Sequence, residues 1–577
     1  MVRQISQNKK SNTNPIITLI KSKILTKKVK VLAFYGLKLI ALSLIFVLST
    51  SYQSPNSSFR EEALELYLRP FQTGMISQFE KFQKSNEVTV NNLEENLKIL
   101  SCNFYRQEGY LPAWTLNFDL TENSAEMLSL LTNANCYGLN SEDYFVNKIK
   151  KLGKKLQQDK NKDRKLKIRQ EFELSLTEAS FKFMINLNRG WIKNDTSLVY
   201  RNYLSSLPDK LNTAIRHNSL TKDILALQPD NYEYKLLQQA LVKFLKTVRL
   251  GDKNFTIPSP GKDLVTCNKL TKLRLTDLGF LSADLAGNDS VFVKALQQFQ
   301  RFYGLDPDGK IGYKTRKALE KSDKYRYEQI AINLDRLRRE CNFSEHYAYI
   351  NIPAFELKLV KNNLPQKSFR VIVGKPDTPT PELSSKIEKI ITHPYWIVPK
   401  SIAINEILPK LKEDSTYLAK HRFNLIDRDK NNISYDNIDW NDVTADDFNY
   451  VFRQDASRNN ALGEIKFIFP NEYSVYLHDT PSKRLFRRNV RAFSHGCIRL
   501  EDPEIFAEYL ACNNTSDQQK DSISNLLKNG IHEEIYLQQP LNVYIRYLTC
   551  SADEQLNLYF YNDIYDKDEA WIDSLIN

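Results

Sequence analysis

The chain is 577 residues long, which is too many for one hydrophobic core, so several domains are expected. Its apolar fraction of 42% and charged fraction of 26% are those of a folded protein, which excludes the disordered and fibrous classes. The net charge of +12 comes without any zinc-finger, RNP-like or recognition-helix pattern, so no nucleic-acid partner is expected. A basic excess that is heaviest near the N-terminus suits a surface close to a membrane or a polyanion.

Residues 1–56 form a basic N-terminal segment with one apolar run. Several lysines precede the stretch VLAFYGLKLIALSLIFVLSTSYQ. Its almost purely apolar part, 39–48, has the length of a signal-peptide core, whereas a membrane span needs about 20 residues. A span over 31–48 stays open if Lys38 reaches the interface. With either interpretation we expect the rest of the chain to be exported to the periplasm. A signal peptide would release it there, and a span would anchor it in the inner membrane.

The seven cysteines are scattered and contain no C-x-x-C pair. An odd number leaves at least one thiol free. A disulfide between Cys102 and Cys136 is compatible with an oxidising compartment, although their spacing does not establish it.

Residues 57–255 are expected to form a helical domain. Segments such as EEALELYLRPF and EFELSLTEASFKFMINLNRGW carry apolar residues at three- and four-residue intervals, which is the helical period. The stretch LPAWTLN interrupts this pattern as a loop that carries Trp114. The stripes of leucine and aromatic residues predict a packed core rather than a binding surface.

A smaller helical module is expected at 265–322. Its sequence predicts a helix, a loop, a long amphipathic helix, the turn DPDGKIG and a last helix that begins at Tyr313 or Lys314. Asp308 and Gly309 suit the tight turn. One face of the long helix is expected to be apolar and to consist of Val293, Leu296, Phe299 and Phe302.

The pattern changes to strands over 345–550. Stretches such as YAYINIPAFELKLV, KSFRVIVGK and NVYIRYLTC alternate and are rich in β-branched and aromatic residues, which predicts an antiparallel sheet domain with one or two helices. At 397–463 the alternation gives way to a charged helical stretch and then a polar loop. An interruption of this length is typical of a functional lid or binding loop. Residues 551–577 follow as a C-terminal tail.

The stretch HDTPSKRLFRRNVRAFSHGCIRL indicates a nucleophilic cysteine. A cysteine attacks as its thiolate and needs a neighbouring base or positive charge. His478 ends a predicted strand and Cys497 lies on a turn, so we expect the two side chains within hydrogen-bonding reach. Gly496 permits a tight backbone whose N–H groups bind an oxyanion, and Arg499 adds positive charge. The arrangement favours acyl transfer through a thioester.

Two other interpretations of this cysteine are weaker. A zinc site built from His478, His495 and Cys497 lacks an evident fourth ligand. A buried, purely structural cysteine leaves the neighbouring histidines without a role. No metal is therefore expected at this cysteine.

The motif YLHDT…RAFSHGCIRL resembles the signature of the L,D-transpeptidase family, with its YkuD-type catalytic domain. The elements LGFL and DGKIGYKT resemble a peptidoglycan-binding module, and the likeness extends to the large multidomain YcbB-like branch. This resemblance implies a multidomain α+β chain. Its parts are an N-terminal helical scaffold domain, a small three-helix peptidoglycan-binding module and a C-terminal mainly-β catalytic domain with a helical capping insertion.

Carried over by position, the resemblance implies that Cys497 is the nucleophile and His478 the general base. His495, Gly496 and Arg499 complete the catalytic loop, although some relatives have Ser where His495 stands, so His495 is not expected to be the indispensable base. Substrate contacts are expected from four side chains near the same site, which are Tyr476, Trp396, Ser494 and Arg499.

The implied reaction needs no metal or organic cofactor, and it begins with attack on the amide before the terminal D-alanine of a tetrapeptide stem. D-alanine leaves, and an amine of a second stem peptide resolves the thioester to give a 3→3 cross-link. The enzyme would serve cell-wall organisation and cell shape, with carbapenem-type β-lactams as inhibitors. Two alternatives stay open. With water as acceptor, the protein would be an L,D-carboxypeptidase or endopeptidase. If Cys497 no longer reacts, the protein would be a non-catalytic wall-binding scaffold.

Overall fold

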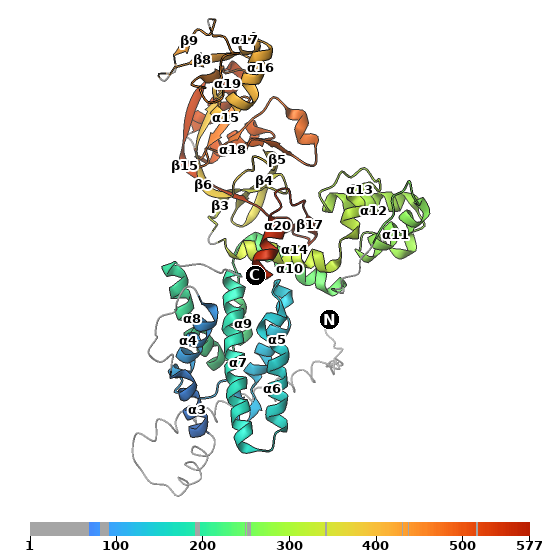
Figure 1. Ribbon diagram of the computed structural model, residues 1–577, viewed down its shortest axis with the longest axis vertical. Coiled ribbons are helices and arrows are strands. Elements are labelled where there is room, and N and C mark those ends of the chain that lie inside the picture. The colour runs from blue at the N-terminus through green and yellow to red at the C-terminus, as the bar shows by residue number, and fades with distance from the viewer. Residues whose placement is uncertain are drawn as a thin grey trace, which may run out of the picture. The chain divides into compact units, whose positions relative to one another are not determined.

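The computed structural model divides the chain into two compact units, 1–77 and 78–577. The predicted signal peptide or anchor lies outside the residues that the structure describes. No helix in the described ranges is long and apolar enough to cross a membrane. Those ranges are 68–80, 92–190, 197–248, 250, 256–340, 343–427, 429, 431–436, 438–514 and 517–576 (Figure 1).

The first domain of the second unit is a helical bundle, as its periodicity predicts. The long helix α7 packs against α4, α5 and α6, and polar N-caps such as Asn161 mark where helices begin. The predicted loop with Trp114 forms the hairpin of β1 and β2. After α3 (Arg69–Phe79), at the boundary of the two units, the elements are α4 (Leu93–Gln107), β1 (Thr115–Leu116), β2 (Asp119–Leu120), α5 (Glu122–Thr132), η2 (Ala134–Tyr137), η3 (Ser141–Tyr144), α6 (Val146–Gln158), α7 (Lys162–Arg189), α8 (Leu198–Arg216), α9 (Leu220–Leu225) and α10 (Tyr232–Thr247).

A buried carboxylate fixes the Trp114 loop to α7. Glu173 accepts hydrogen bonds from the backbone N–H of Ala113 (2.9 Å) and of Trp114 (3.0 Å) and from the hydroxyls of Tyr105 (2.9 Å) and Thr115 (2.7 Å). A buried charge with this many donors is satisfied, so the cluster is a structural anchor of the bundle.

The small module has the predicted order of helices, and its last helix begins at Tyr313. Gly309 of the turn has φ +68°, and a Cβ there would approach Val293 to 2.8 Å, so the turn needs glycine. The apolar face of α12 differs from the prediction, because Val293 is 39% exposed while Phe292 is buried. The elements are α11 (Leu264–Asp277), η4 (Ala283–Leu285), α12 (Asp289–Phe302) and α13 (Tyr313–Glu320), followed by α14 (Asp323–Arg338).

The third domain is built on a nine-stranded sheet with the order β13-β5-β14-β12-β11-β6-β15-β3-β4. A further pairing of β4 with β5 closes the sheet on itself. The expected antiparallel sheet is in fact mixed, since β12–β14, β13–β5 and β15–β3 are parallel. The strands are β3 (His346–Asn351), β4 (Glu356–Lys361), β5 (Leu364–Gly374), β6 (Leu383–Thr392), β11 (Ile465–Ile468), β12 (Leu477–His478), β13 (Ala492–Ser494), β14 (Ile498–Leu500) and β15 (Glu533–Arg546).

The parallel pairs follow from long connections. The parallel partners β12 and β14 are joined by a connection that contains η6 (Lys483–Arg487) and β13, and the partners β5 and β13, like β3 and β15, lie far apart in the chain. Connections of this length let the chain return in the same direction, as parallel pairing requires. Helices α18 (Pro503–Asn514) and α19 (Asp517–Asn529) lie between β14 and β15. Apolar residues of α18, such as Phe506 and Leu510, share one core with the strands. The sheet is therefore a closed scaffold around a single hydrophobic cluster.

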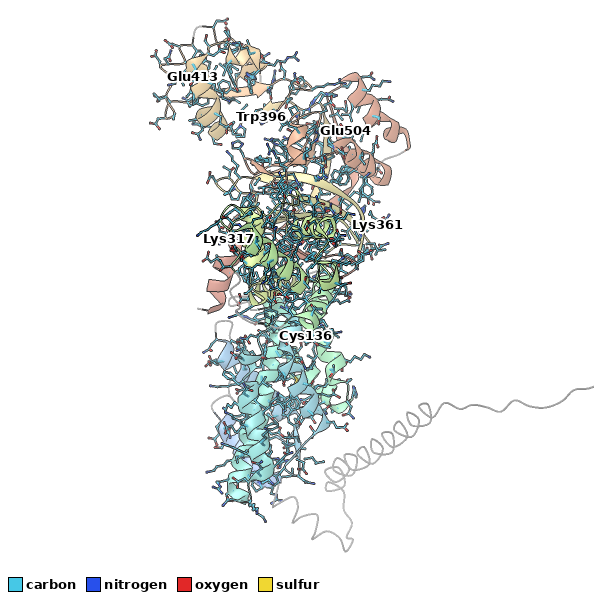
Figure 2. All side chains as sticks on the ribbon, turned by 90° about the vertical axis from the view of Figure 1, so that its right-hand side faces the viewer. Cys136, Lys317, Lys361, Trp396, Glu413 and Glu504 are labelled. Carbon is cyan, nitrogen blue, oxygen red and sulfur yellow. The ribbon has the colours of Figure 1, made fainter. Side chains whose placement is uncertain are left out.

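The insertion at 397–463 forms a small subdomain with its own core. Its first part is helical, as expected, and the stretch expected to be a polar loop adds β9 and β10, which are the two strands that pair with β8 in a four-stranded sheet of order β7-β10-β8-β9. Trp396 lies at the base of the insertion and Glu413 farther from the large sheet (Figure 2). The elements are β7 (Trp396–Ile397), α15 (Lys400–Ile402), the π-helix η5 (Ala403–Ile407), α16 (Leu408–Glu413), α17 (Tyr417–Lys420), β8 (Phe423–Ile426), β9 (Asn432–Ile433) and β10 (Val451–Gln454).

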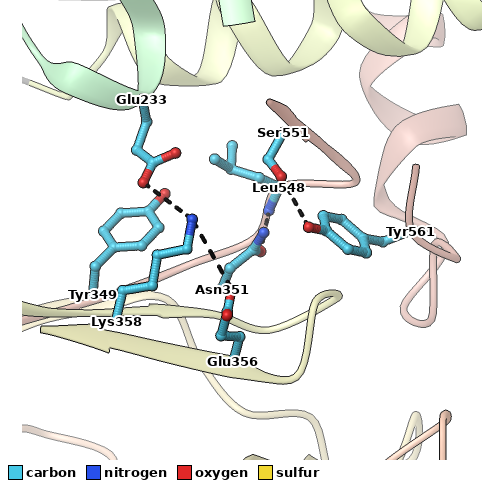
Figure 3. A pocket seen from close by; sticks show the side chains of 8 residues that line it. All are labelled: Glu233, Tyr349, Asn351, Glu356, Lys358, Leu548, Ser551 and Tyr561. Atoms are coloured by element: carbon cyan, nitrogen blue, oxygen red, sulfur yellow. Dashed lines mark hydrogen bonds and ion pairs between the residues drawn. The ribbon is translucent and has the colours of Figure 1, made fainter. Parts of the chain in front are cut away.

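The final segment folds against the rest of the second unit as β16 (Cys550–Ala552), β17 (Leu558–Phe560) and α20 (Lys567–Ile576). Beside it, Glu233 of α10 reaches toward Lys358 of β4, with the two charged groups 3.6 Å apart (Figure 3). The Glu233 carboxylate raises the pKa of Lys358. The cavity between them measures about 10 Å³, room for one water, so it is a structural contact between helix and sheet.

Candidate active site

Strand register brings the predicted residues to one face of the sheet. Strands β12 and β14 run parallel, with Leu477 opposite Ile498 and His478 opposite Arg499. Leu477 and Ile498 are both fully buried in the sheet core. Because side chains alternate along a strand, their neighbours point to the other face. That face carries Tyr476, His478, Cys497 and Arg499.

Tyr476 is the centre of this group. Its ring lies edge-to-face with His478, with 5.6 Å between centroids, and the Lys466 ammonium lies 3.7 Å from the centre of the Tyr476 ring. The phenol is in hydrogen-bonding contact with the Cys497 thiol and with the side chain of Trp396. Since an indole can only donate, Trp396 donates to the phenol oxygen and the phenol donates toward sulfur. Tyr476 therefore links Cys497 to the base of the insertion.

The Cys497 thiol is held in its protonated form. Burial raises the pKa of Cys497 above its ordinary value, and this outweighs hydrogen bonds from the backbone and phenol of Tyr476 and the charges of Lys466 and Arg499, which lower it. Positive neighbours alone would suggest a thiolate. The structure shows that desolvation of the sulfur is the larger effect.

His478 is a neutral imidazole at physiological pH. The residue is 5% exposed, and burial, with the positive charges of Arg499 and Lys466, lowers the pKa of His478 to about 3. A neutral imidazole is able to accept a proton. The resting site therefore contains a thiol and a free base rather than a thiolate–imidazolium pair.

The turn before β11 packs against Asp479, the residue that follows His478. Asp479 is buried, accepts a hydrogen bond from the backbone N–H of Glu464 (2.9 Å) and forms an ion pair with Lys483 (2.5 Å). Gly463 has φ +63°, and a Cβ there would approach the Asp479 carboxylate to 2.2 Å. Only glycine fits this contact, so the strand end that carries His478 is rigidly seated.

The S-H-G-C loop is a hydrogen-bonded turn. The Ser494 hydroxyl donates to the carbonyl of Cys497 (2.5 Å) and accepts from the backbone N–H of Gly496 (3.2 Å). Gly496 has φ +109°, a conformation that favours glycine. Both hydrogen bonds of the Ser494 hydroxyl lie within the turn, and its expected contact with substrate stays a prediction.

His495 points toward the insertion. Its Nε2 lies 2.5 Å from Oε1 of Glu406, which belongs to the π-helix η5. Single π-helical turns are rare and occur frequently at functional sites. The partner of His495 is thus a carboxylate of the inserted subdomain. The expectation that His495 is not the indispensable base stays a prediction.

Two residues of the site were not singled out from the sequence. Lys466 alternates with the buried Ile465 and Phe467 on β11, so the pattern I-K-F marks it as facing away from the core. Its place opposite His478 follows only from strand pairing. Glu406 carried no local signal, because nothing in the sequence around it indicates that it contacts the S-H-G-C loop.

Cys497 is one of several free thiols. Cys102 and Cys136, for which a disulfide was considered, are both unpaired. Within the described ranges, no three side chains of His, Cys, Asp or Glu gather as a metal site would require.

Three segments match known domain families. Residues 345–518 match the L,D-transpeptidase catalytic domain (YkuD), 101–241 a scaffold domain and 269–319 a "Putative peptidoglycan binding domain". A "Putative L,D-transpeptidase" of Haemophilus influenzae is 31% identical over 226 residues, which are 39% of this chain and 42% of that protein. The match thus spans less than half the length of this relative.

Proposed function

Because this chain carries a catalytic domain of the L,D-transpeptidase family, we propose that it forms 3→3 cross-links between peptidoglycan stem peptides through a thioester on Cys497. The observation that carries the proposal is the shared face of β12 and β14, which holds a cysteine, a neutral histidine, a tyrosine and an arginine side by side. These are the groups that acyl transfer through a thioester needs.

The first step is attack by Cys497 on the amide before the terminal D-alanine. Since the resting thiol is protonated, its proton passes to His478 as the sulfur attacks, and His478 then protonates the departing amine. The side-chain amine of a second stem displaces the thiol from the thioester and returns a proton through His478. D-alanine and the cross-linked product are the only species released.

Substrate recognition is assigned to side chains that surround the thiol. The Nε atom of Arg499 is buried and has no hydrogen-bond partner among the described residues, so it is available to a stem carboxylate. Tyr476 and Trp396 present aromatic surface beside the sulfur. Their positions support binding of the peptide on the face of the sheet that carries Cys497.

The inserted subdomain is proposed to cap Cys497. Its Glu406 contacts His495 of the catalytic loop, and its Trp396 contacts Tyr476. A thioester must be shielded from water if an amine is to resolve it. A separate hydrophobic core allows the subdomain to move as a body without unfolding the sheet.

The peptidoglycan-acting domains favour a periplasmic or cell-wall location. The module at 269–319 is proposed to hold the enzyme on its polymeric substrate. Inhibition by carbapenems follows as part of the same proposal, because a β-lactam carbonyl offers Cys497 an acyl group. Anchoring in the inner membrane concerns 1–56, which lie outside the described residues.

The proposal is tested by incubating the purified protein, without residues 1–56, with tetrapeptide-containing wall fragments. Mass spectrometry of the muropeptides should show 3→3 cross-linked dimers and free D-alanine, and Cys497→Ala should form neither. Tripeptides without dimers would instead identify water as the acceptor and a carboxypeptidase. No turnover by a folded, thiol-reactive protein would support a wall-binding scaffold.

A further inference from the structure

A loop remote in sequence holds the peptide group in front of Cys497. Thr380, between β5 and β6, is 1% exposed, and its hydroxyl donates to the carbonyl of Gly496 (2.8 Å). The same hydroxyl accepts a hydrogen bond from the backbone N–H of Gly374 (2.9 Å). The nearby Thr378 hydroxyl donates to the carbonyl of Ser494 (3.2 Å). The loop thus binds two carbonyls of the S-H-G-C turn.

The Gly496 carbonyl and the Cys497 N–H belong to one peptide group. A peptide bond is planar and trans, so its C=O and N–H point in opposite directions. When Thr380 fixes the direction of the carbonyl, it also fixes the direction of the Cys497 N–H. The N–H of a nucleophilic residue is a donor for the oxyanion that forms when the nucleophile attacks a carbonyl.

The C-terminal segment holds Thr380 in turn. The Tyr565 phenol donates to the carbonyl of Gly374 (2.7 Å) and accepts from the backbone N–H of Thr380 (3.1 Å). Its ring stacks on Tyr547, with centroids 5.4 Å apart. A Cβ at Gly374 would approach the carbonyl of Thr378 to 2.1 Å, so the loop closes tightly around these contacts. The donor and the acceptor of the phenol are both engaged in bracing this loop.

We propose that Thr380 is a positioning residue that aims the Cys497 N–H at the developing oxyanion, and that Tyr565 of the C-terminal segment keeps Thr380 in place. This rests on the proposed acyl-transfer function of Cys497 and adds two residues to the machinery that serves it. Neither residue touches the substrate. Both act through the orientation of the Gly496–Cys497 peptide group.

Two reactions of the same thiol separate this role from simple support of the fold. Acylation by meropenem passes through a tetrahedral oxyanion, whereas alkylation by iodoacetamide does not. Thr380→Val, which keeps the shape and removes the hydroxyl, should slow acylation about 10- to 100-fold, less than the loss of a whole oxyanion donor. Alkylation should change less than about 3-fold because the sulfur itself is unchanged. Intact-protein mass spectrometry measures both rates.

Two further variants sharpen the result. Thr380→Ser keeps the hydroxyl and should restore acylation to near the wild-type rate. Tyr565→Phe should slow acylation by a smaller factor, about 3- to 10-fold, since it removes the brace but leaves the Thr380 hydroxyl in place. If Thr380→Val does not fold, Tyr565→Phe provides the same comparison of acylation with alkylation.

The matched control is Thr392→Val. Thr392 is also fully buried, and its hydroxyl donates to the carbonyl of Ile531 (2.8 Å) and accepts from the N–H of Glu533 (3.1 Å). These hydrogen bonds hold the start of β15 and not the S-H-G-C turn. Its acylation rate should match that of the wild type. Equal losses in acylation and alkylation, an unchanged acylation rate in Thr380→Val, or an equal loss in the control would each overturn the proposal. Failure of wall cross-linking alone would refute the proposed function and leave this comparison intact.

Discussion

The large closed sheet and the inserted subdomain divide the site between them. The sheet carries Cys497 and His478 over its own core, with α18 packed against it. The subdomain has a separate core and four strands of its own, and it reaches the catalytic face through Trp396 and Glu406. This difference suggests that the sheet fixes the reacting groups, while the subdomain controls what else reaches them.

The largest effect should come from removing the sheet's nucleophile. Cys497→Ala should abolish thioester formation, because alanine lacks the atom that forms it, and should leave the melting temperature within a few degrees of wild type. Intact mass after meropenem treatment is the readout, with Cys102→Ala as the control thiol. Acylation that persists in Cys497→Ala would place the nucleophile elsewhere.

His478 lies on the closed sheet, whereas His495 contacts the inserted subdomain, so their substitution should affect turnover to different extents. His478→Gln should lower turnover about 10²- to 10⁴-fold, the usual contribution of a general base. His495→Ser, which removes the contact with Glu406, should cost no more than about 5-fold, because polar contacts between exposed side chains contribute little. The steady-state rate of cross-linking is measured for both variants. Equal losses would contradict the assignment of the general base to His478 rather than His495.

The pH dependence of alkylation tests the resting state of the sheet. Because burial raises the pKa of Cys497, the thiolate fraction should increase about 10-fold per pH unit, or about 100-fold from pH 6 to pH 8. With the pKa of His478 lowered to about 3, the histidine carries no proton in that range. A plateau in the iodoacetamide rate between pH 6 and pH 8 would reveal a thiolate–imidazolium pair instead.

Recognition at the border between the two regions should give intermediate effects. Arg499→Ala and Tyr476→Ala should each lower kcat/KM about 10- to 100-fold, since each removes a group in contact with the thiol or available to a carboxylate. Kinetics on tetrapeptide donors measures the loss, and Lys148→Ala, which removes an exposed pair with Glu171 in the helical domain, serves as control. Losses no larger than that of the control would mean that the site lies elsewhere.

A smaller change, and one in the products rather than in the rate of acylation, is expected when the subdomain is removed without altering the sheet. Replacing 401–459 by a short Gly/Ser linker should preserve acylation of Cys497 but shift the products from cross-linked dimers toward hydrolysed tripeptides, by about 3- to 10-fold. The ratio of the two products is read from muropeptide mass spectra. An unchanged ratio in a folded variant would show that the subdomain is not a cap.

Much of the site was within reach of local sequence patterns. The alternation around Tyr476 and His478 predicts that their side chains share a face, and the strand pairing agrees. The alternation also marks Lys466, although only the pairing of β11 with β12 shows what it faces. Helical periodicity wrongly placed Val293 on the buried face of α12, where Phe292 lies instead. The period alone does not show which of two adjacent apolar residues is buried, because that depends on what packs against the helix.

The sequence by itself determined the types of most elements and the order of the domains, and it pointed to the residues proposed to carry the chemistry, because periodicity and motifs are local properties. Only the tertiary structure decided the protonation of Cys497, since burial and charge come from several strands at once. It also decided that Glu406 meets His495 and that Thr380 reaches Gly496 across 116 positions of the chain. Contacts of this kind depend on how the sheet closes, and no local pattern records that.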